Sequence, residues 1–377
     1  MRESSANTLF FADVLPHEQR IRHKLPPLRA LTSIRFFAAI HVVLFHEGVQ
    51  SALTRFPLAA HFISSGFTGV TLFFVLSGFI LAYNYRQVAS PRSFFIARFA
   101  RIYPIYLLAL LSTMLLSLVH IGEVTSNIFV GFLLSLPLLQ AWFYSYALLV
   151  NVPAWTLSVE AFFYVVFPFV LPWLSRPRRT LVVVLAVAWV LITAAPFLTH
   201  GIPLLAVSSL RFAITLERTN PIARLPCFLL GAWAGARFLQ APRRRQPMLL
   251  SFSSAAALAL LIWNPTPTLL PLRTSLLTLA YTGLLFALAT VEWKLLTNRW
   301  MQIAGEISYG IYILQMPFFR AWRGLMERLH AHLLTLPIFS ITGLIFTAWL
   351  THHYIEMPAR VAIRRFLTHQ PVPTMPI

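Results

Sequence analysis

The first apolar stretch of the chain, residues 28–48, reads LRALTSIRFFAAIHVVLFHEG. A helix needs about 20 predominantly apolar residues to cross the hydrocarbon core of a bilayer, and this stretch has that length. It also carries Arg35 and His46, two side chains that are costly to place in lipid. The stretch therefore predicts a membrane-spanning helix with two polar groups that need an environment inside the protein.

Further apolar stretches of similar length follow along the chain. Of the 377 residues, 58% are hydrophobic and only 11% are charged, whereas a soluble domain is about a quarter charged. A soluble protein of this size has too little interior to bury so much apolar surface. We therefore expect an all-α fold, a polytopic transmembrane helical bundle of about ten spans. The expected spans are residues 28–48, 66–85, 101–121, 153–174, 180–198, 222–240, 248–264, 273–291, 302–321 and 333–354.

One further apolar stretch, residues 126–150, is interrupted by Pro137 and by the more polar sequence QAWFYSY. If this stretch crossed the membrane, the arginine clusters at 176–179 and 243–245 would lie outside. If it enters the membrane and returns, every dense basic cluster lies on one side, as the positive-inside rule requires. We therefore expect a re-entrant or interfacial segment here, buried in protein or lining a cavity.

This topology places both termini in the cytoplasm. The expected organisation is a cytosolic N-terminal arm at 1–27, a membrane domain at 28–356 and a cytosolic C-terminal tail at 357–377. We expect an integral protein of the bacterial cytoplasmic (inner) membrane. Any chemistry then takes place in or at the bilayer.

The composition excludes several other classes of protein. The formal net charge is +19, but the basic residues form short clusters between apolar stretches, whereas a nucleic-acid-binding protein gathers them on one solvated face. A single cysteine, Cys227, excludes a disulfide framework and a cysteine-based zinc site. The chain has no glycine-rich phosphate loop and no His-Glu-x-x-His motif, so we expect no bound cofactor and no metal. Asp13 is the only aspartate, so a Ser-His-Asp triad cannot form in the membrane.

Arg35 and His46 are predicted to share one face of the first helix. Their spacing of eleven residues corresponds to three turns plus about 20°, which separates them by about 16 Å along the axis. Ala39 and Val42 lie between them on that face and leave room for something narrow. The alternative is that Arg35 reaches the cytosolic headgroups and that His46 is an interface residue.

Glu160 lies about two turns inside another expected span. An isolated carboxylate at this depth is either neutral or paired with a base. Arg35 and His46 are the candidate partners from another helix. A purely structural ion pair between helices is the alternative.

Arg98 and Arg101 stand at the cytosolic entry of the third expected span. Residues three apart are neighbours on a helix surface, and two guanidinium groups suit a phosphate-bearing cytosolic ligand. The alternative is simple anchoring to anionic lipid, which spacing alone favours.

These stretches together resemble the acyltransferase 3 family of integral membrane O-acyltransferases, over about residues 31–365. The matching elements are Arg35 and His46 (Arg-x10-His), residues 69–79 (GVTLFFVLSGF), 98–104 (RFARIYP), 155–160 (WTLSVE), 307–312 (ISYGIY) and 354–360 (YIEMPAR). The chain departs from the family at Thr71, where many members carry Asp, and at Gln315, where many carry His. We therefore assign no catalysis to Gln315.

The resemblance implies transfer of an acyl group, most often acetyl, from cytosolic acyl-CoA to a hydroxyl group. His46 would act as general base or transient acyl carrier. Glu160 would hold the tautomer of His46, and Arg35 would stabilise oxyanion charge or keep Glu160 ionised. Arg98 and Arg101 would bind the CoA phosphates.

The remaining site residues and partners also follow from the resemblance. Ser77, Trp155 and Ser158 belong to the matching motifs and would bind substrate or support the site. Acyl-CoA is expected as co-substrate. The expected acceptor is a saccharide or its lipid-linked precursor, with polysaccharide biosynthesis or export proteins as partners. Exopolysaccharide, O-antigen, a lipid and a small secondary metabolite such as a macrolide all remain open as acceptors.

Two other classes of function remain as alternatives. A polytopic transporter or flippase for a saccharide or lipid would also carry buried ionisable residues, although the chain shows no matching pair of broken spans in its two halves. A catalytically inactive membrane scaffold would tolerate apolar replacements of Arg35, His46 and Glu160.

Overall fold

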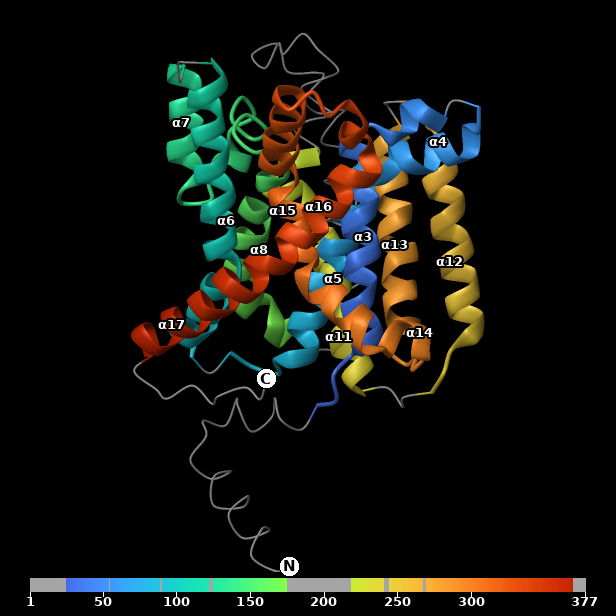
Figure 1. The fold of residues 1–377 in the computed structure, drawn as a ribbon. Coiled ribbons are helices and arrows are strands. Elements are labelled where there is room, and N and C mark those ends of the chain that lie inside the picture. Colours follow the sequence, from blue (N-terminus) through green and yellow to red (C-terminus); the bar gives the residue numbers. More distant parts are fainter. Residues whose placement is uncertain are drawn as a thin grey trace, which may run out of the picture.

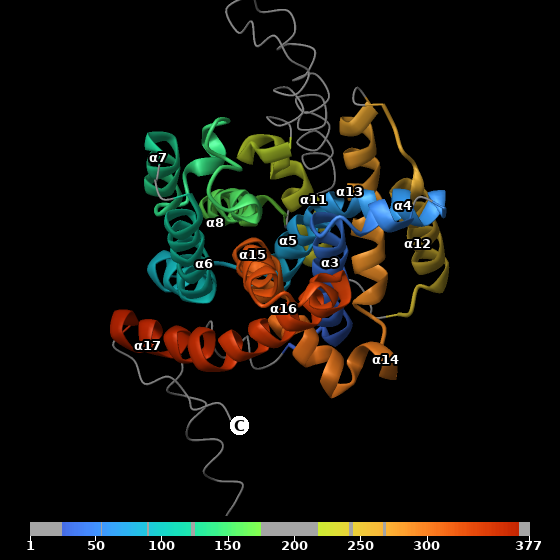
Figure 2. The same cartoon turned by 45° about the horizontal axis from the view of Figure 1, so that its top comes forward.

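The computed structural model describes residues 25–53, 55–88, 90–121, 125–174, 218–240, 244–266 and 269–368. All regular elements in these ranges are helices, as expected (Figure 1). The helices form a bundle in which α6 and α7 make one edge and α12 and α4 make the opposite edge (Figures 1 and 2). The longer helices are α3 (Arg29–His46), α5 (Gly69–Asn84), α6 (Pro91–Ile121), α8 (Trp155–Leu174), α11 (Pro221–Gln240), α12 (Pro247–Ile262), α13 (Leu270–Leu288), α15 (Arg299–Arg328) and α16 (Pro337–Thr351). The shorter ones are α4 (Pro57–Ser64), α7 (Ser126–Ser135), α14 (Lys294–Thr297) and α17 (Met357–Thr368).

Within the described ranges, six helical stretches are long and apolar enough to cross a membrane. They correspond to six of the expected spans and are Arg29–His46, Pro57–Asn84, Pro91–Val119, Val152–Leu174, Pro221–Gln240 and Leu270–Leu288. The expected span at 180–198 lies outside the described residues.

The other three expected spans differ in length from the prediction. The span expected at 248–264 is α12, which has 16 residues. The one expected at 333–354 begins with a 3₁₀ turn, so its α-helix α16 has only 15 residues. The one expected at 302–321 is part of the 30-residue helix α15, which starts at the cap Asn298 where the side chain accepts a hydrogen bond from the Met301 amide.

The stretch expected to be re-entrant contains a half-length helix. Helix α7 has 10 residues, which is about 15 Å and too short to cross a bilayer. It returns alongside α6 and stops at mid-height, where the Tyr106 hydroxyl donates to the Ser135 carbonyl at 2.7 Å. Gln140 then donates to the Ala154 carbonyl at 2.9 Å, just before α8 begins. This geometry is that of a segment that enters and returns; its position in a bilayer stays a prediction.

Glycines bring the central helices into backbone contact. A methyl group on Gly231 of α11 would overlap the Val75 carbonyl of α5, and one on Gly305 of α15 would overlap the Thr32 carbonyl of α3. Such close approach between helices is possible only where no side chain intervenes. The contact at Gly305 fixes α3 against α15, and these two helices carry much of the site described below.

The C-terminal segment continues the bundle instead of leaving it. Helix α16 passes through a π-helical turn, His352–Glu356, into α17. Helix α17 then runs across the outside of the bundle past α6, at the end where α3 begins (Figures 1 and 2). The first 12 residues of the expected tail are therefore helical and packed on the protein.

Candidate functional site

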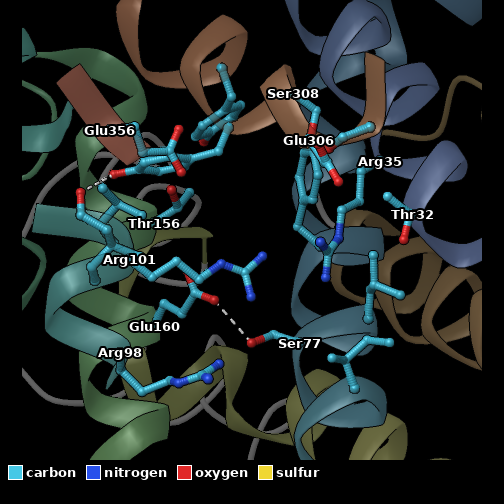
Figure 3. Close-up of a pocket in the computed structure, with 18 of the residues that line it drawn as sticks. Thr32, Arg35, Ser77, Arg98, Arg101, Thr156, Glu160, Glu306, Ser308 and Glu356 are labelled. Carbon is cyan, nitrogen blue, oxygen red and sulfur yellow. Dashed lines mark hydrogen bonds between the residues drawn. The ribbon is translucent and has the colours of Figure 1, made fainter. Parts of the chain in front are cut away.

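A cavity of about 440 Å³ opens among α3, α5, α6, α8, α15 and the start of α17 (Figure 3). Its walls combine charged groups of both signs with apolar side chains. The charged residues on the wall are Arg35, Arg98, Arg101, Arg360, Glu160, Glu306 and Glu356. Five predicted site residues, Arg35, Ser77, Arg98, Arg101 and Glu160, thus come together from four helices.

Arg35 and the arginine pair of α6 approach the cavity from opposite sides (Figure 3). Arg98 is 6% exposed, and its guanidinium lies 6.0 Å from the ring centre of Tyr85. This burial differs from the position of an arginine that only anchors the protein to headgroups. Arg35 likewise faces the cavity, so the alternative that it extends to the membrane surface is not what the structure shows.

Glu160 is hydrogen-bonded to side chains other than its predicted partners, Arg35 and His46. It accepts hydrogen bonds from the Ser77 hydroxyl at 2.9 Å and from the Tyr164 hydroxyl at 2.6 Å. The expectation that Glu160 holds the tautomer of His46 is therefore wrong in this structure, because both hydrogen bonds that it receives lie inside the cavity and His46 is not on the cavity wall.

The C-terminal helix adds a third arginine beside Arg98 and Arg101. Arg360 of α17 lies on the cavity wall, and its Nε is buried without a hydrogen-bond partner among the described residues. Burial and the nearby positive charges of Arg101, Arg364 and Arg98 lower the pKa of Arg360 from 12.5 to about 10. The group is thus held among like charges, an arrangement that an anion would stabilise.

A His–Glu pair stands next to this third arginine. Nδ1 of His352 lies 2.9 Å from an oxygen of Glu356, across the π-helical turn, and both residues line the cavity. The sequence indicated this segment only through the motif at 354–360. Nothing in the sequence indicated that His352 lines the cavity, because this depends on how the π-helical turn orients its side chain.

His46 occupies a separate position at the far end of α3. Its Nδ1 lies 3.0 Å from Oε1 of Gln315 on α15. Nε2 of Gln315 donates to the Tyr312 carbonyl at 2.6 Å, which fixes the orientation of the amide. Because Oε1 can only accept, Nδ1 of His46 carries the proton and Nε2 is the basic nitrogen. Gln315 therefore has the orienting position that we expected for Glu160.

The helix face between Arg35 and His46 is closed. Ala39 and Val42 are 0% and 1% exposed, so the narrow space expected beside them is filled by packing. The end of α3 is also anchored, because the next residue, Glu47, bonds Arg323 at 3.0 Å and Ser340 at 2.9 Å. His46 thus sits on a fixed helix end, apart from the charged cavity.

Trp155 and Ser158, two further predicted site residues, lie outside the cavity wall. Trp155 packs edge-on against Phe74, with ring centres 6.0 Å apart. Ser158 is buried and accepts a hydrogen bond from the Ala141 amide at 3.4 Å. Both residues position α8, while their neighbour Thr156 reaches the cavity. In the part of the chain that the structure describes, no group of three or more His, Cys, Asp or Glu side chains is placed to hold a metal ion.

Comparison with known protein families gives one match that covers most of the chain. The family model described as an acyltransferase domain matches residues 28–352. His46 and most residues of the cavity wall fall within this region, while Glu356 and Arg360, which also line the cavity, follow it. No solved structure matches the chain.

Three curated relatives bear on activity. The chain is 22% identical to the peptidoglycan O-acetyltransferase OatA of Listeria monocytogenes, over 88% of this chain and 55% of that protein. It is 33% identical to the acyltransferase MdmB of Streptomyces mycarofaciens, over 38% of this chain and 40% of that protein. A putative acetyltransferase, ORF330 of Acidianus two-tailed virus, is 25% identical over 79% of this chain and 83% of its own length. The chain thus spans about half the length of the first two relatives.

Proposed function

The chain belongs to the acyltransferase 3 family, and from this premise we propose that it is a membrane O-acyltransferase that uses cytosolic acyl-CoA. The acyl group is acetyl, and the acceptor is a hydroxyl of a cell-surface saccharide or its lipid-linked precursor. The observation that carries this proposal is the polarity of the cavity, which has three arginines at one end. Beyond the other end of the cavity lies His46, a histidine whose proton is held on Nδ1.

The arginine end of the cavity suits the phosphates of the donor. Arg98 and Arg101 project from α6 and Arg360 from α17, so two elements converge on one space. Guanidinium groups bind phosphate oxygens in pairs of parallel hydrogen bonds. A coenzyme A molecule bound here would relieve the repulsion among these charges. Arg35 lies deeper on the opposite wall and would contact the rest of the donor.

His46 supplies the base of the proposed reaction. Its Nε2 takes the proton of the acceptor hydroxyl as that oxygen attacks the thioester carbonyl. The carbon–sulfur bond then breaks, the ester forms, and the CoA sulfur leaves with the proton returned by the imidazolium. In the variant route through an acyl-histidine, Nε2 itself attacks and the acceptor displaces it.

The geometry changes the role proposed for Arg35. Arg35 faces the cavity, and His46 lies about 16 Å further along the same helix. One carbonyl cannot contact both side chains at once in this arrangement. We therefore assign Arg35, with Glu160 and Ser77 on the same wall, to binding the donor, and no longer to the oxyanion.

The test is acyl-CoA turnover by the purified protein in nanodiscs, with bacterial cell extract as acceptor. Release of CoA and label transfer from labelled acetyl-CoA are measured for wild type, His46→Ala and Arg98→Ala/Arg101→Ala. We expect the histidine variant to lose transfer but keep donor binding, and the double variant to need much more donor. Arg365→Ala, an exposed arginine of α17, is the matched control and keeps both.

Two outcomes would contradict the proposal. Full transfer by a folded His46→Ala protein would remove His46 from the reaction. If the wild type neither binds acetyl-CoA nor releases CoA, the transporter or flippase alternative takes its place. That alternative then predicts uptake of labelled saccharide or lipid into vesicles containing the protein.

A further inference from the structure

The end of the cavity opposite the arginines is uncharged. It is formed by Val70 and Phe73 of α5, Thr156 and Leu157 of α8, and Tyr312 of α15. A ligand that fills the whole cavity must therefore be anionic at one end and apolar at the other. An acyl thioester of coenzyme A has this polarity, since the acyl chain lies at the opposite end from the phosphates.

Two aromatic rings close this uncharged end. The rings of Phe73 and Tyr312 meet edge to face, with centres 5.6 Å apart. The Tyr312 hydroxyl donates to the Pro153 carbonyl at 3.3 Å, and the Tyr312 carbonyl accepts from Gln315. The tyrosine is thus held at both ends, and its ring is a fixed wall.

This ring pair lies between the cavity and His46. Gln315, the partner of His46, is three residues beyond Tyr312 on α15, which is about 4.5 Å along the helix. Tyr312 lines the cavity, whereas Gln315 and His46 do not. On the α3 side, the fully buried Ala39 and Val42 leave no open space between the cavity and His46.

The geometry points to Phe73 and Tyr312 as the residues that set the length of the acyl group. This inference rests on the proposed function, since it takes the cavity as the donor site. An acyl chain that enters ahead of the thioester meets the two rings, and each added methylene group must find space against them. A short acyl group lets the thioester carbonyl advance to the ring pair, the part of the cavity wall nearest His46, whereas a longer one holds the carbonyl back among the charged residues.

The experiment measures kcat/KM for acetyl-, butyryl-, hexanoyl- and octanoyl-CoA with the purified protein in nanodiscs. The variants are Tyr312→Leu and Phe73→Leu/Tyr312→Leu, which remove ring volume from the wall. We expect the hexanoyl-to-acetyl ratio of kcat/KM to rise about tenfold or more. One methylene group changes the kcat/KM of a substrate in a closely fitting apolar pocket by this order of magnitude. The single variant decides the question if the double variant does not fold, with a smaller shift in the same direction.

Two matched variants separate ring volume from other effects. Tyr312→Phe keeps the ring and loses only the hydroxyl, so we expect it to keep the wild-type chain-length profile. Phe79→Leu removes a buried ring from α5, the helix that carries Phe73, at a position that packs on Phe238 and does not line the cavity. We expect this variant to keep both the activity and the chain-length profile.

The outcomes distinguish this inference from the function on which it rests. If the wild type turns over acetyl-CoA and the leucine variants keep its chain-length profile, the ring pair does not measure the acyl group. If Tyr312→Phe shifts the profile as strongly as Tyr312→Leu, the hydroxyl and not the ring is responsible, and the inference is overturned. If the wild type consumes no acyl-CoA of any length, the proposed function itself is wrong.

Discussion

The contact between His46 and Gln315 fixes the state of the base in the proposed reaction. It decides which imidazole nitrogen carries the proton, because the Gln315 amide is oriented by the Tyr312 carbonyl. A neutral histidine of fixed tautomer is a suitable base for a hydroxyl acceptor. The contact gives a glutamine the orienting function often supplied by a carboxylate.

We expect Gln315→Leu to lower kcat about 10²-fold, because Nδ1 of His46 loses its acceptor and the tautomer is no longer fixed. The KM for acetyl-CoA should stay near the wild-type value, since the arginines of the proposed donor site are unchanged. Gln315→Glu retains an acceptor oxygen and should recover part of kcat. Steady-state kinetics on the three proteins checks this. A loss shared equally by both variants would show that an acceptor oxygen at position 315 is not what sustains kcat.

Replacing Arg360 is predicted to have opposite effects on the stability of the protein and on its binding of acetyl-CoA. Its pKa is lowered to about 10 by burial and by the nearby arginines, so the charged group is less favourable in the folded protein than in the unfolded chain. Arg360→Gln should therefore raise the melting temperature of the ligand-free protein and weaken acetyl-CoA binding about tenfold. Arg365→Gln should change neither. Thermal unfolding with and without acetyl-CoA measures both effects, and unchanged donor binding would remove Arg360 from the site.

At the scale of helices, α5 and α11 are in direct backbone contact. Gly78, Gly231 and Gly235 bring the two backbones together, and each lacks the space for a methyl group. The contact positions the wall of the cavity formed by α5. Backbone atoms cannot move aside as side chains do, so these positions depend on glycine.

Gly231→Ala should destabilise the protein by about 3 kcal/mol, since the new methyl group would overlap the Val75 carbonyl. Gly310→Ala is the control on α15, where the new methyl group would lie 3.3 Å from the Ala348 side chain and 3.6 Å from its backbone atoms, without overlap. We expect the control to lose much less. Thermal unfolding in detergent compares the two, and equal melting temperatures would show that α5 and α11 separate easily.

The helices show what the sequence can and cannot predict. Hydropathy located six spans, because the cost of exposing backbone and polar groups to lipid acts on each segment separately. It misjudged the ends of α16, since a proline start and a π-helical turn are local events inside an apolar stretch. The predicted motif residues Arg35, Ser77, Arg98, Arg101 and Glu160 do gather in one cavity. Tyr164, one partner of Glu160, lies four residues along the same helix, but partners on other helices were not predictable, because spacing along one helix does not reveal which helix faces it.

At the scale of the whole molecule, the arginine end of the cavity and His46 lie toward opposite ends of the bundle. Helix α3 begins at the lower end of the bundle in the view of Figure 1 and rises toward α4. The positive-inside rule predicts that the arginine end faces the cytoplasm. The donor and the acceptor would then approach from different sides of the membrane.

Labelling of introduced cysteines checks this orientation. The single native cysteine, Cys227, is buried, so background labelling should be low. In intact spheroplasts, a membrane-impermeant maleimide should label Leu58→Cys on α4 and should leave Arg365→Cys on α17 unlabelled until the membrane is permeabilised. Both positions are exposed. The reverse pattern would invert the topology and place the donor site outside the cytoplasm.

The ring pair of Phe73 and Tyr312 has a consequence for the cell as well as for the enzyme. A continuous wet path lined by four arginines would conduct small anions and discharge the membrane potential. An uncharged constriction opposes this, because an ion that enters it must shed its hydration without replacement. In the proposed reaction, the protein would then present an acyl group toward the far side while the membrane around it remains an electrical insulator.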